Sequence, residues 1–191
     1  MAAEVFTIGY QGATLAALVE ALRAASVSVL IDTRETPMSR RPEFRRRSLE
    51  TALEQAGIHY VSRPSLGAPR ELRALASDWE RFSLGYRERL ALVREELEGL
   101  VSIVASERAC LLCFEADPAA CHRSLLAHEI QRLLDVDTVH LRPRRIDEPE
   151  DDGVCRTTFR WEIREPRGGS GNPPARSDGR GSGRRQSGVP A

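Results

Sequence analysis

The chain has 191 residues, 41% of them hydrophobic, and a formal net charge of zero. This length and apolar fraction favour one folded domain, and the lack of a run of about 18 apolar residues argues against a membrane-spanning helix. All 28 basic residues are arginine, and five of them lie in residues 166–191 with a single aspartate. The residues before this segment are therefore mildly acidic, which argues against a domain whose main task is to hold a nucleic-acid backbone.

The N-terminus and the cysteines favour the cytoplasm. The first residues lead directly into a strand-like stretch, without the basic and apolar regions of a secretory signal. Cysteines of a cytoplasmic chain stay reduced, so we expect no disulfide framework. Three of the four cysteines nevertheless cluster between residues 110 and 121, and this clustering requires a reason.

Strand-like and helix-like patterns alternate from the N-terminus. Residues 5–9 and 27–32 have the apolar, β-branched composition of buried strands. Between them, apolar residues at helical spacing predict a helix, with Thr14 as its N-cap. The strand–helix–strand unit has the size of a right-handed crossover.

The alternation continues along the rest of the chain. In order, we predict an Arg-rich loop (33–47), a short helix (48–56) that ends at Gly57, a strand (58–61), a loop (62–77), a mainly helical segment (78–106) with a break near Gly85, a strand (110–114), a helix (118–134) and a strand (138–141). Strands that alternate with helices indicate a parallel sheet covered on both faces. We therefore predict a three-layer α/β fold with a mostly parallel sheet of about five strands flanked by helices.

The domain organisation follows from composition. We predict a single α/β domain over residues 1–165, with its core in 5–143 and a C-terminal β appendage in 144–165, where 154–163 forms a hairpin or an edge strand. Residues 166–191 contain 11 glycines or prolines and almost no large apolar side chain. Such a segment cannot offset the entropy of folding, so we expect a disordered basic tail.

Polar residues follow the predicted strands at their carboxyl ends. Ligands of open parallel sheets bind beyond these ends. Tyr10 follows the first strand, and Asp32 and Arg34 follow the second. We interpret Tyr10 and Arg34 as anion-binding residues and Asp32 as a general acid or base.

The segment from Cys113 to Arg123 is the strongest candidate for a site. A strand delivers Cys113 and, two residues later, Glu115 to the same face. The following helix carries Cys121, His122 and Arg123 in its early turns, close to the N–H groups and partial positive charge of its N-terminus. Such an end stabilises a thiolate or binds an anion. We predict Cys113, Glu115, Cys121 and His122 as catalytic residues and Arg123 as an anion ligand.

The same segment has other interpretations. Cys113 can be a small buried hydrophobe, and Arg123 can be a structural tie. A reversible Cys113–Cys121 disulfide requires that their Cα atoms lie within about 7 Å. A tetrahedral metal site formed by Cys110, Cys113, Cys121 and His122 is possible but awkward, because Cys110 and Cys113 point to opposite faces of a strand and the adjacent Cys121 and His122 converge poorly. We therefore expect no metal and no other cofactor.

Two basic segments suggest a second kind of ligand. Residues 40–47 hold five arginines near the end of the second strand, and the tail holds five more. Arginines in such segments can hold RNA or DNA loosely, without sequence preference. Nucleic acid is therefore an alternative partner to a small anion, while no membrane partner is expected.

An ordered set of short motifs resembles a known family. These motifs are Thr7-Ile-Gly-Tyr, Asp32-Thr-Arg, Pro37-Met-Ser, Gly57-Ile-His-Tyr, Leu66-Gly and Cys113-Phe-Glu with Cys121-His-Arg. Over residues 5–141 the chain resembles the uncharacterised bacterial and archaeal family known as the domain of unknown function 488. The resemblance implies a single α/β domain and singles out Tyr10, Asp32, Arg34, Cys113, Glu115, Cys121, His122 and Arg123, but it implies no reaction. Gln11 and Ala68 stand where the family commonly has Ser and Gly.

Three functional hypotheses follow from these features. The first is an enzyme that binds a small phosphorylated or nucleotide-like anion at the carboxyl edge of the sheet. The second is a nucleic-acid or nucleotide-binding module without catalysis, and the third is a thiol redox sensor. The sequence specifies neither the substrate nor the oligomeric state.

Overall fold

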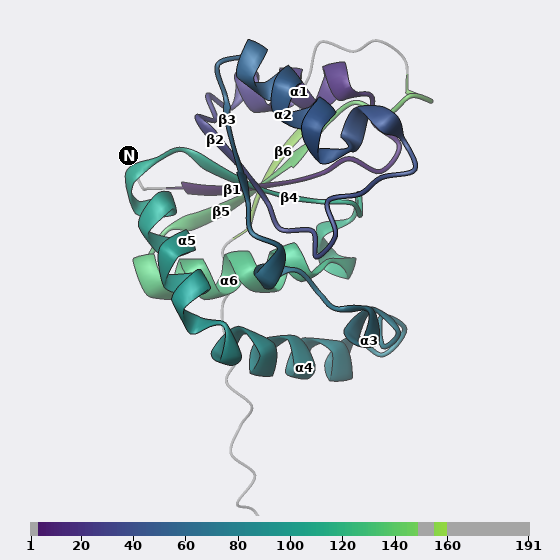
Figure 1. Ribbon diagram of the computed structural model, residues 1–191. Helices are drawn as coiled ribbons and strands as arrows, with labels where there is room; N and C mark the ends of the chain where they lie inside the picture. Colours follow the sequence, from purple (N-terminus) through teal and green to yellow (C-terminus); the bar gives the residue numbers. More distant parts are fainter. Residues whose placement is uncertain (1–3, 149–154, 160–191) are drawn as a thin grey trace, which may run out of the picture. The chain divides into compact units, whose positions relative to one another are not determined.

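The computed structural model describes residues 4–148 and 155–159, which form a six-stranded sheet with helices on both faces (Figure 1). The strand order is β3-β2-β4-β1-β5-β6. Strands β1 to β5 run parallel, and β6 pairs antiparallel with β5. The predicted three-layer α/β fold with a mostly parallel sheet is therefore confirmed. The strands are β1 (Glu4–Gly9), β2 (Val29–Asp32), β3 (His59–Ser62), β4 (Ala109–Cys113), β5 (Asp137–Arg142) and β6 (Cys155–Phe159).

The helices divide between the two faces of the sheet. Helices α1 and α2 cover one face, while α5 and α6 cover the other, with α4 packed outside α6 (Figure 1). The helices are α1 (Leu15–Ala24), α2 (Arg46–Gln55), α3 (Arg70–Arg73), α4 (Trp79–Leu92), α5 (Arg94–Ser106) and α6 (His122–Leu134), with short 3-10 turns at Pro42–Phe44, Pro64–Leu66 and Pro118–Ala120.

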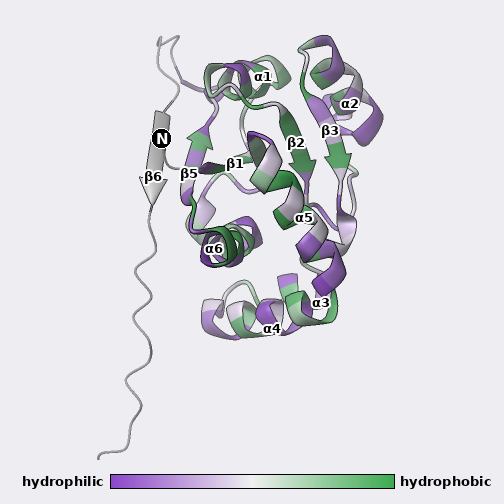
Figure 2. Ribbon diagram, turned by 90° about the vertical axis from the view of Figure 1, so that its left-hand side faces the viewer, coloured by the Kyte–Doolittle hydropathy of each residue, from purple (hydrophilic) through white to green (hydrophobic). Residues whose placement is uncertain are grey.

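Alternation along the central strands produces two hydrophobic cores. Ile31 and Leu111 face the α4–α6 side, whereas Leu30, Cys110 and Leu112 face α1 and α2. All five residues are fully buried. Strands β2 and β4 are covered on both faces, so both of their faces must be apolar. Strand β2 is accordingly coloured hydrophobic along its length in Figure 2.

Local signals explain most element boundaries. Thr14 caps α1, since its side chain accepts a hydrogen bond from the Ala17 N–H, and Gly57 adopts a positive φ of 73° after α2. The sequence predicts a helix break near Gly85, but the break lies at Val93 instead. A Cβ atom at Gly85 would lie 2.7 Å from a methyl group of Leu72, so this glycine serves the close approach of α3 and does not interrupt α4.

The start of α6 also differs from the sequence expectation. The sequence predicts a helix from Pro118 that contains Cys121, but Pro118 opens a separate 3-10 turn. Cys121 is the N-cap of α6, with an extended backbone (φ −133°, ψ 136°), and His122 is the first helical residue. Both residues therefore lie at the helix N-terminus.

The connections separate at the carboxyl end of β4. The chain leaves the neighbouring strands β1 and β2 toward α1 and α2 on one face, but it leaves β4 toward α6 on the other face. Parallel sheets bind ligands where the connections diverge in this way. The fold thus places the end of β4, with Cys113, at the expected location of a site.

The C-terminal predictions are only partly described by the structure. The predicted edge strand in residues 154–163 is present as β6, antiparallel to β5. The described residues belong to one compact unit. The proposed limit of the domain at residue 165 and the tail 166–191 lie outside the described residues. Within 4–148 and 155–159, no helix combines the length and the apolar character needed to cross a membrane.

His140 on β5 makes the stability of the fold depend on pH. Its Nδ1 lies 2.6 Å from the Thr7 hydroxyl, and the side chain is 6% exposed. Burial and, to a smaller extent, the charge of Arg123 lower the pKa of His140 to about 4, against an opposing effect of Asp117. Since the unfolded pKa is near 6.5, the unfolded chain binds a proton below this pH that the folded chain does not bind.

We predict that the free energy of unfolding falls as the pH drops from 6.5 to 4, with a His140 contribution of at most about 3 kcal/mol. His140→Asn keeps an acceptor near Thr7 but does not titrate, so its stability should fall less over this window. Urea unfolding of both proteins at several pH values measures the difference. Parallel pH profiles would show that His140 is not responsible.

Candidate functional site

Four side chains converge at the carboxyl end of β4. Cys113 ends the strand, Glu115 lies in the following loop, and Cys121 and His122 begin α6. One ligand atom from each, a sulfur, an oxygen or a ring nitrogen, lies within 4.8 Å of all the others. The thiols of Cys113 and Cys121 both donate to Oε2 of Glu115, at 2.8 and 3.1 Å. We call these four residues the thiol cluster.

Backbone geometry explains why adjacent residues meet in the thiol cluster. The sequence predicts that Cys121 and His122 converge poorly, and this prediction is wrong, because Cys121 is extended while His122 is helical. Both sulfur atoms approach Nδ1 of His122, Cys113 at 3.6 Å and Cys121 at 3.9 Å. Cys110 lies on the opposite face of β4, as predicted, and is buried in the core toward α1 and α2. The fourth member of the cluster is Glu115 instead.

The orientation of His122 is fixed by a backbone carbonyl. Nε2 of His122 lies 3.1 Å from the carbonyl oxygen of Thr33, which can only accept a hydrogen bond. Nε2 therefore carries the proton, and in the neutral ring Nδ1 is the acceptor that faces the two sulfur atoms. The ring of Tyr86 packs edge-on against His122, with the ring centres 5.4 Å apart.

Burial and neighbouring groups shift the pKa values of three members of the thiol cluster. Burial, together with the neighbouring Cys113, raises the pKa of Cys121 well above its ordinary value. Burial alone would raise the pKa of Glu115, but the hydrogen bonds from the two thiols lower it. Burial likewise opposes the charge on His122, yet Cys121 and Glu115 raise its pKa. The resting cluster thus holds a neutral Cys121 thiol against the Glu115 carboxylate.

Arg123 supports the loop that carries Glu115. It is 1% exposed, and its terminal nitrogens donate to the carbonyl oxygens of Glu115 at 2.6 Å and Ala116 at 3.0 Å. Its Nε donates to the Thr7 hydroxyl at 3.4 Å. The sequence predicts Arg123 as an anion ligand, but the structure commits its guanidinium to backbone and hydroxyl acceptors.

Asp32 and Arg34 form a second buried group beside the cluster. Arg34 binds both carboxylate oxygens of Asp32 at 2.8 and 2.5 Å, and it also donates to the Tyr10 hydroxyl and the Phe44 carbonyl. Tyr60 donates its hydroxyl to the same carboxylate at 2.6 Å. Burial alone would lower the pKa of Arg34, but Asp32 and Tyr10 raise it above its ordinary value.

This network changes the roles predicted from the sequence. Asp32 is 0% exposed, and donors from Arg34 and Tyr60 already occupy its oxygens, so it lacks the open lone pair that a general base needs. Tyr10 and Arg34 both line the adjacent pocket, although most of the Arg34 N–H groups are engaged. The structure therefore holds Asp32 in a closed hydrogen-bond network beside the pocket.

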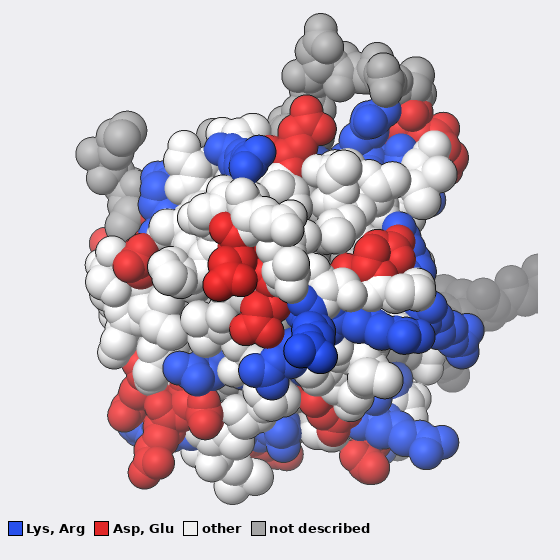
Figure 3. Space-filling model, turned by 45° about the horizontal axis from the view of Figure 1, so that its top comes forward, with Lys and Arg blue, Asp and Glu red and all other residues white. Residues whose placement is uncertain are grey.

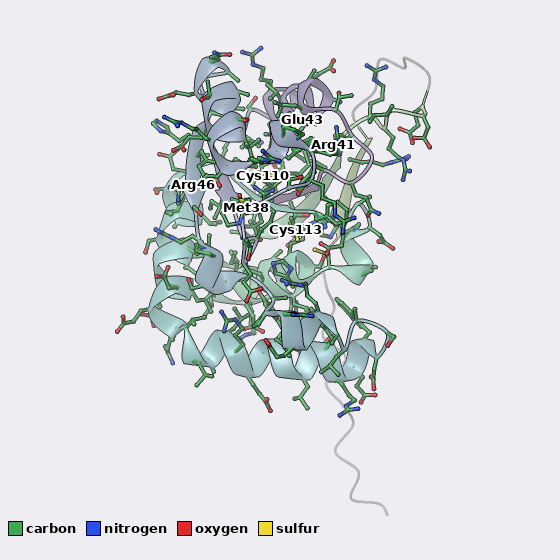
Figure 4. All side chains as sticks on the ribbon, turned by 45° about the vertical axis from the view of Figure 1, so that its right-hand side comes forward. Met38, Arg41, Glu43, Arg46, Cys110 and Cys113 are labelled. Atoms are coloured by element: carbon green, nitrogen blue, oxygen red, sulfur yellow. The ribbon has the colours of Figure 1, made fainter. Side chains whose placement is uncertain are left out.

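A pocket of about 780 Å³ opens over the thiol cluster. This volume is typical of small-molecule sites. One part of the pocket is lined by Cys113, Glu115 and His122. The rest includes four arginines, which are Arg34, Arg40, Arg41 and Arg73. It also includes apolar side chains, among them Met38, Trp79 and Phe114. Figure 4 shows Cys113 at the end of its strand, with Met38 and Arg41 on the loop beside it.

Some of these contributors are missed by sequence reasoning. Thr33 orients His122 through its carbonyl, and its hydroxyl donates to the Leu112 carbonyl at 2.9 Å. Tyr86, Trp79 and Phe114 also reach the site. Thr33 could have been found, because it stands between the two nominated residues of Asp32-Thr-Arg. Phe114 carries the same signal, because it stands between Cys113 and Glu115. Tyr86 and Trp79 carry none, since only the packing of α4 brings them near the site.

The fold and the cluster define the class of this protein as an α/β domain with a buried Cys/Glu/His site at the end of a central strand. The family model of the domain of unknown function DUF488 matches residues 14–130, which include the whole thiol cluster. The chain belongs to this family, and the resemblance seen in its motifs is confirmed. No curated protein and no solved structure gives a significant match.

Gly9 permits the close approach of the Glu115 loop to β1. A Cβ atom at Gly9 would lie 1.8 Å from the Glu115 carbonyl oxygen, whereas one at Gly99 in α5 would meet nothing within 4 Å. We predict that Gly9→Ala lowers the free energy of unfolding by about 1–3 kcal/mol or more. Gly99→Ala should raise it by about 0.5–1 kcal/mol, as a helical glycine replacement does. Chemical denaturation compares the two, and equal effects would contradict the contact.

Arg123 provides a second test of how the site is supported. Arg123→Met leaves two carbonyl acceptors without their donor, so we expect a loss of about 2–4 kcal/mol in the free energy of unfolding. Arg132→Met, on the exposed side of the same helix, should change stability by less than about 0.5 kcal/mol. If Arg123→Met kept full stability and only lost ligand binding, Arg123 would be an anion ligand after all.

Proposed function

We propose that the protein is an enzyme that acts on a small phosphorylated or nucleotide-like anion. One observation carries the proposal: a single pocket is lined both by Cys113, Glu115 and His122 and by arginine side chains. Its location at the diverging connections of a parallel sheet supports the same conclusion. The free thiols of Cys110, Cys113 and Cys121 are consistent with the proposed cytoplasmic location.

The arginines of the pocket favour an anionic ligand. Arg40 is exposed, and Arg73 is 49% exposed and paired with Glu35 at 2.9 Å. Such exposed ion pairs contribute little free energy, so a phosphate can replace the carboxylate at small cost. Phe114, which is 46% exposed, offers a ring face or edge for a flat base. Together these features fit a nucleotide-like compound.

The thiol cluster favours catalysis over simple binding. A recognition pocket for an anion has no need of two buried thiols that share one carboxylate. Cys113 can act as the nucleophile, with Glu115 at 2.8 Å as the group that accepts its proton. The lowered pKa of Glu115 opposes this transfer in the resting cluster, so thiolate formation needs further positive charge nearby.

One observation favours a nucleic-acid ligand as a second candidate. Arg45, Arg46 and Arg47 are all exposed at the start of α2, within the predicted basic loop. Figure 3 shows arginine side chains gathered in a band on the face drawn, with acidic side chains beside it. Such a band can hold a phosphate backbone, and binding of this kind weakens steeply with added salt.

The first test is a thermal-shift screen with nucleotides, sugar phosphates and short oligonucleotides. A ligand at about 100 times its Kd should add about 2.7 kcal/mol of stability. Arg40→Ala should weaken binding of a small hit by about tenfold or more, while Arg94→Ala, on exposed α5 away from the pocket, should not. Cys113→Ser should bind the hit but lose its turnover.

The outcomes separate the two candidates. If only oligonucleotides stabilise the protein, and this effect depends strongly on salt and is weakened by Arg46→Ala, the protein is the nucleic-acid-binding candidate and not the proposed enzyme. Stabilisation by a small phosphorylated compound that is never converted would leave a binding module. No stabilisation by any of these compounds would refute the anion pocket.

A further inference from the structure

We propose that the thiol cluster is a zinc site, in which Cys113, Cys121, Nδ1 of His122 and Glu115 bind one divalent cation of the zinc class. The sequence predicts no metal here, because it considers Cys110 as the fourth donor and expects the side chains to diverge. With Glu115 in that place, the four donor atoms all lie within 4.8 Å of one another. The site stands on this geometry whatever ligand the pocket takes.

The distances between donors are close to those of a tetrahedral zinc site. With Zn–S bonds near 2.3 Å and Zn–N or Zn–O bonds near 2.0–2.2 Å, neighbouring donors should lie about 3.3–3.8 Å apart. Nδ1 of His122 lies 3.6 Å from the sulfur of Cys113 and 3.9 Å from that of Cys121. Glu115 Oε2 lies at 2.8 and 3.1 Å from the sulfurs, where thiol protons now bridge the atoms. Replacing the two protons by one cation requires shifts of under about 1 Å.

The chemistry of the donors selects the cation. Two sulfurs with one imidazole nitrogen and one carboxylate oxygen suit zinc, whereas magnesium and calcium prefer oxygen ligands alone. Cys113, Cys121 and His122 are at most 6% exposed, so a bound ion would be shielded from solvent on three sides. Two thiolates and a carboxylate carry three negative charges, and a divalent cation would offset two of them.

The surroundings of the cluster prepare the donors in advance. Metal-binding histidines usually donate their second ring N–H to a carbonyl or carboxylate, and His122 already donates Nε2–H to Thr33. Cys121 is the N-cap of α6, where the partial positive charge of the helix N-terminus acts on its sulfur against the effect of burial. Arg123 and the space at Gly9 hold the Glu115 loop in place. These contacts are independent of the donor distances and point to the same ligand.

The ion would be reached through the pocket. Cys113, Glu115 and His122 line the pocket, whereas Cys121 is not among its lining residues. The cation would therefore lie at the pocket wall, with the Glu115 side toward a bound compound. It would also supply the positive charge that converts the thiols to thiolates, since coordinated sulfur is deprotonated. The two thiol protons would then leave to solvent, and Glu115 would act as a ligand in place of the proton acceptor that it is in the metal-free cluster.

The decisive experiment loads the full-length chain with Zn²⁺ or Co²⁺ after removal of metal under reducing conditions. We expect one ion per chain, a rise in Tm, and with Co²⁺ a thiolate charge-transfer band together with the strong visible bands of a tetrahedral centre. Cys121→Ala should weaken binding at least tenfold and reduce the charge-transfer band. Cys110→Ala, which removes an equally buried thiol on the other face of β4, should bind as the wild type does.

Each alternative outcome is decisive. Binding that survives Cys121→Ala, or that Cys110→Ala also abolishes, would overturn the site. A chain that binds no stoichiometric metal would also overturn the site. If such a chain formed a Cys113–Cys121 disulfide after mild oxidation, the two cysteines would be a redox pair instead. Glu115→Gln keeps the fold contacts of the loop backbone and should weaken binding while the charge-transfer band persists. The anion screen, repeated with and without Zn²⁺, reports separately on the proposed enzyme function.

Discussion

The close passage of two backbone segments at Gly9 and Glu115 is the constraint on which the site depends. The chain leaves β4 so near to β1 that no side chain fits at Gly9, and the ladder continues beyond the strands through the Tyr10 and Gln11 N–H groups to the carbonyls of Cys113 and Phe114. This contact directs Glu115 back toward Cys113 and α6. The buried guanidinium of Arg123 then secures the loop by its carbonyl groups.

The arginines of this protein serve two different purposes. Arg34 and Arg123 are buried, and their N–H groups satisfy a carboxylate, a hydroxyl and several carbonyls, so they act as fixed cross-links between strand ends. Arg40 is exposed at the pocket, and Arg73 is 49% exposed there, with Glu35 and the Ala68 carbonyl as its partners. A pocket built in this way has a rigid floor and an adaptable rim. Rigid placement of reactive groups with a mobile charged entrance suits a small anionic substrate.

Much of the fold could be predicted from the sequence, because its signals are local. The spacing of apolar residues after Thr14 and the glycine at position 57 specify their helix ends without help from distant residues. The rule for parallel sheets also pointed to the strand ends, where the thiol cluster lies. The roles of Arg34 and Arg123 could not be predicted, since a sequence does not say which acceptors a guanidinium meets. The convergence of Cys121 and His122 was missed because the turn at Pro118 shifts the helix start.

The thiol cluster draws all of its donors from residues 113–122, although contacts from β1, β2 and α4 hold it in shape. Because the four donors are so close in sequence, they stay near one another when the chain unfolds. The proposed cation would therefore bind the denatured chain as well as the native one, so metal would stabilise the fold by less than its affinity alone suggests. The same locality would allow a nascent chain to capture its ion soon after residue 122 is synthesised, before β5 completes the sheet.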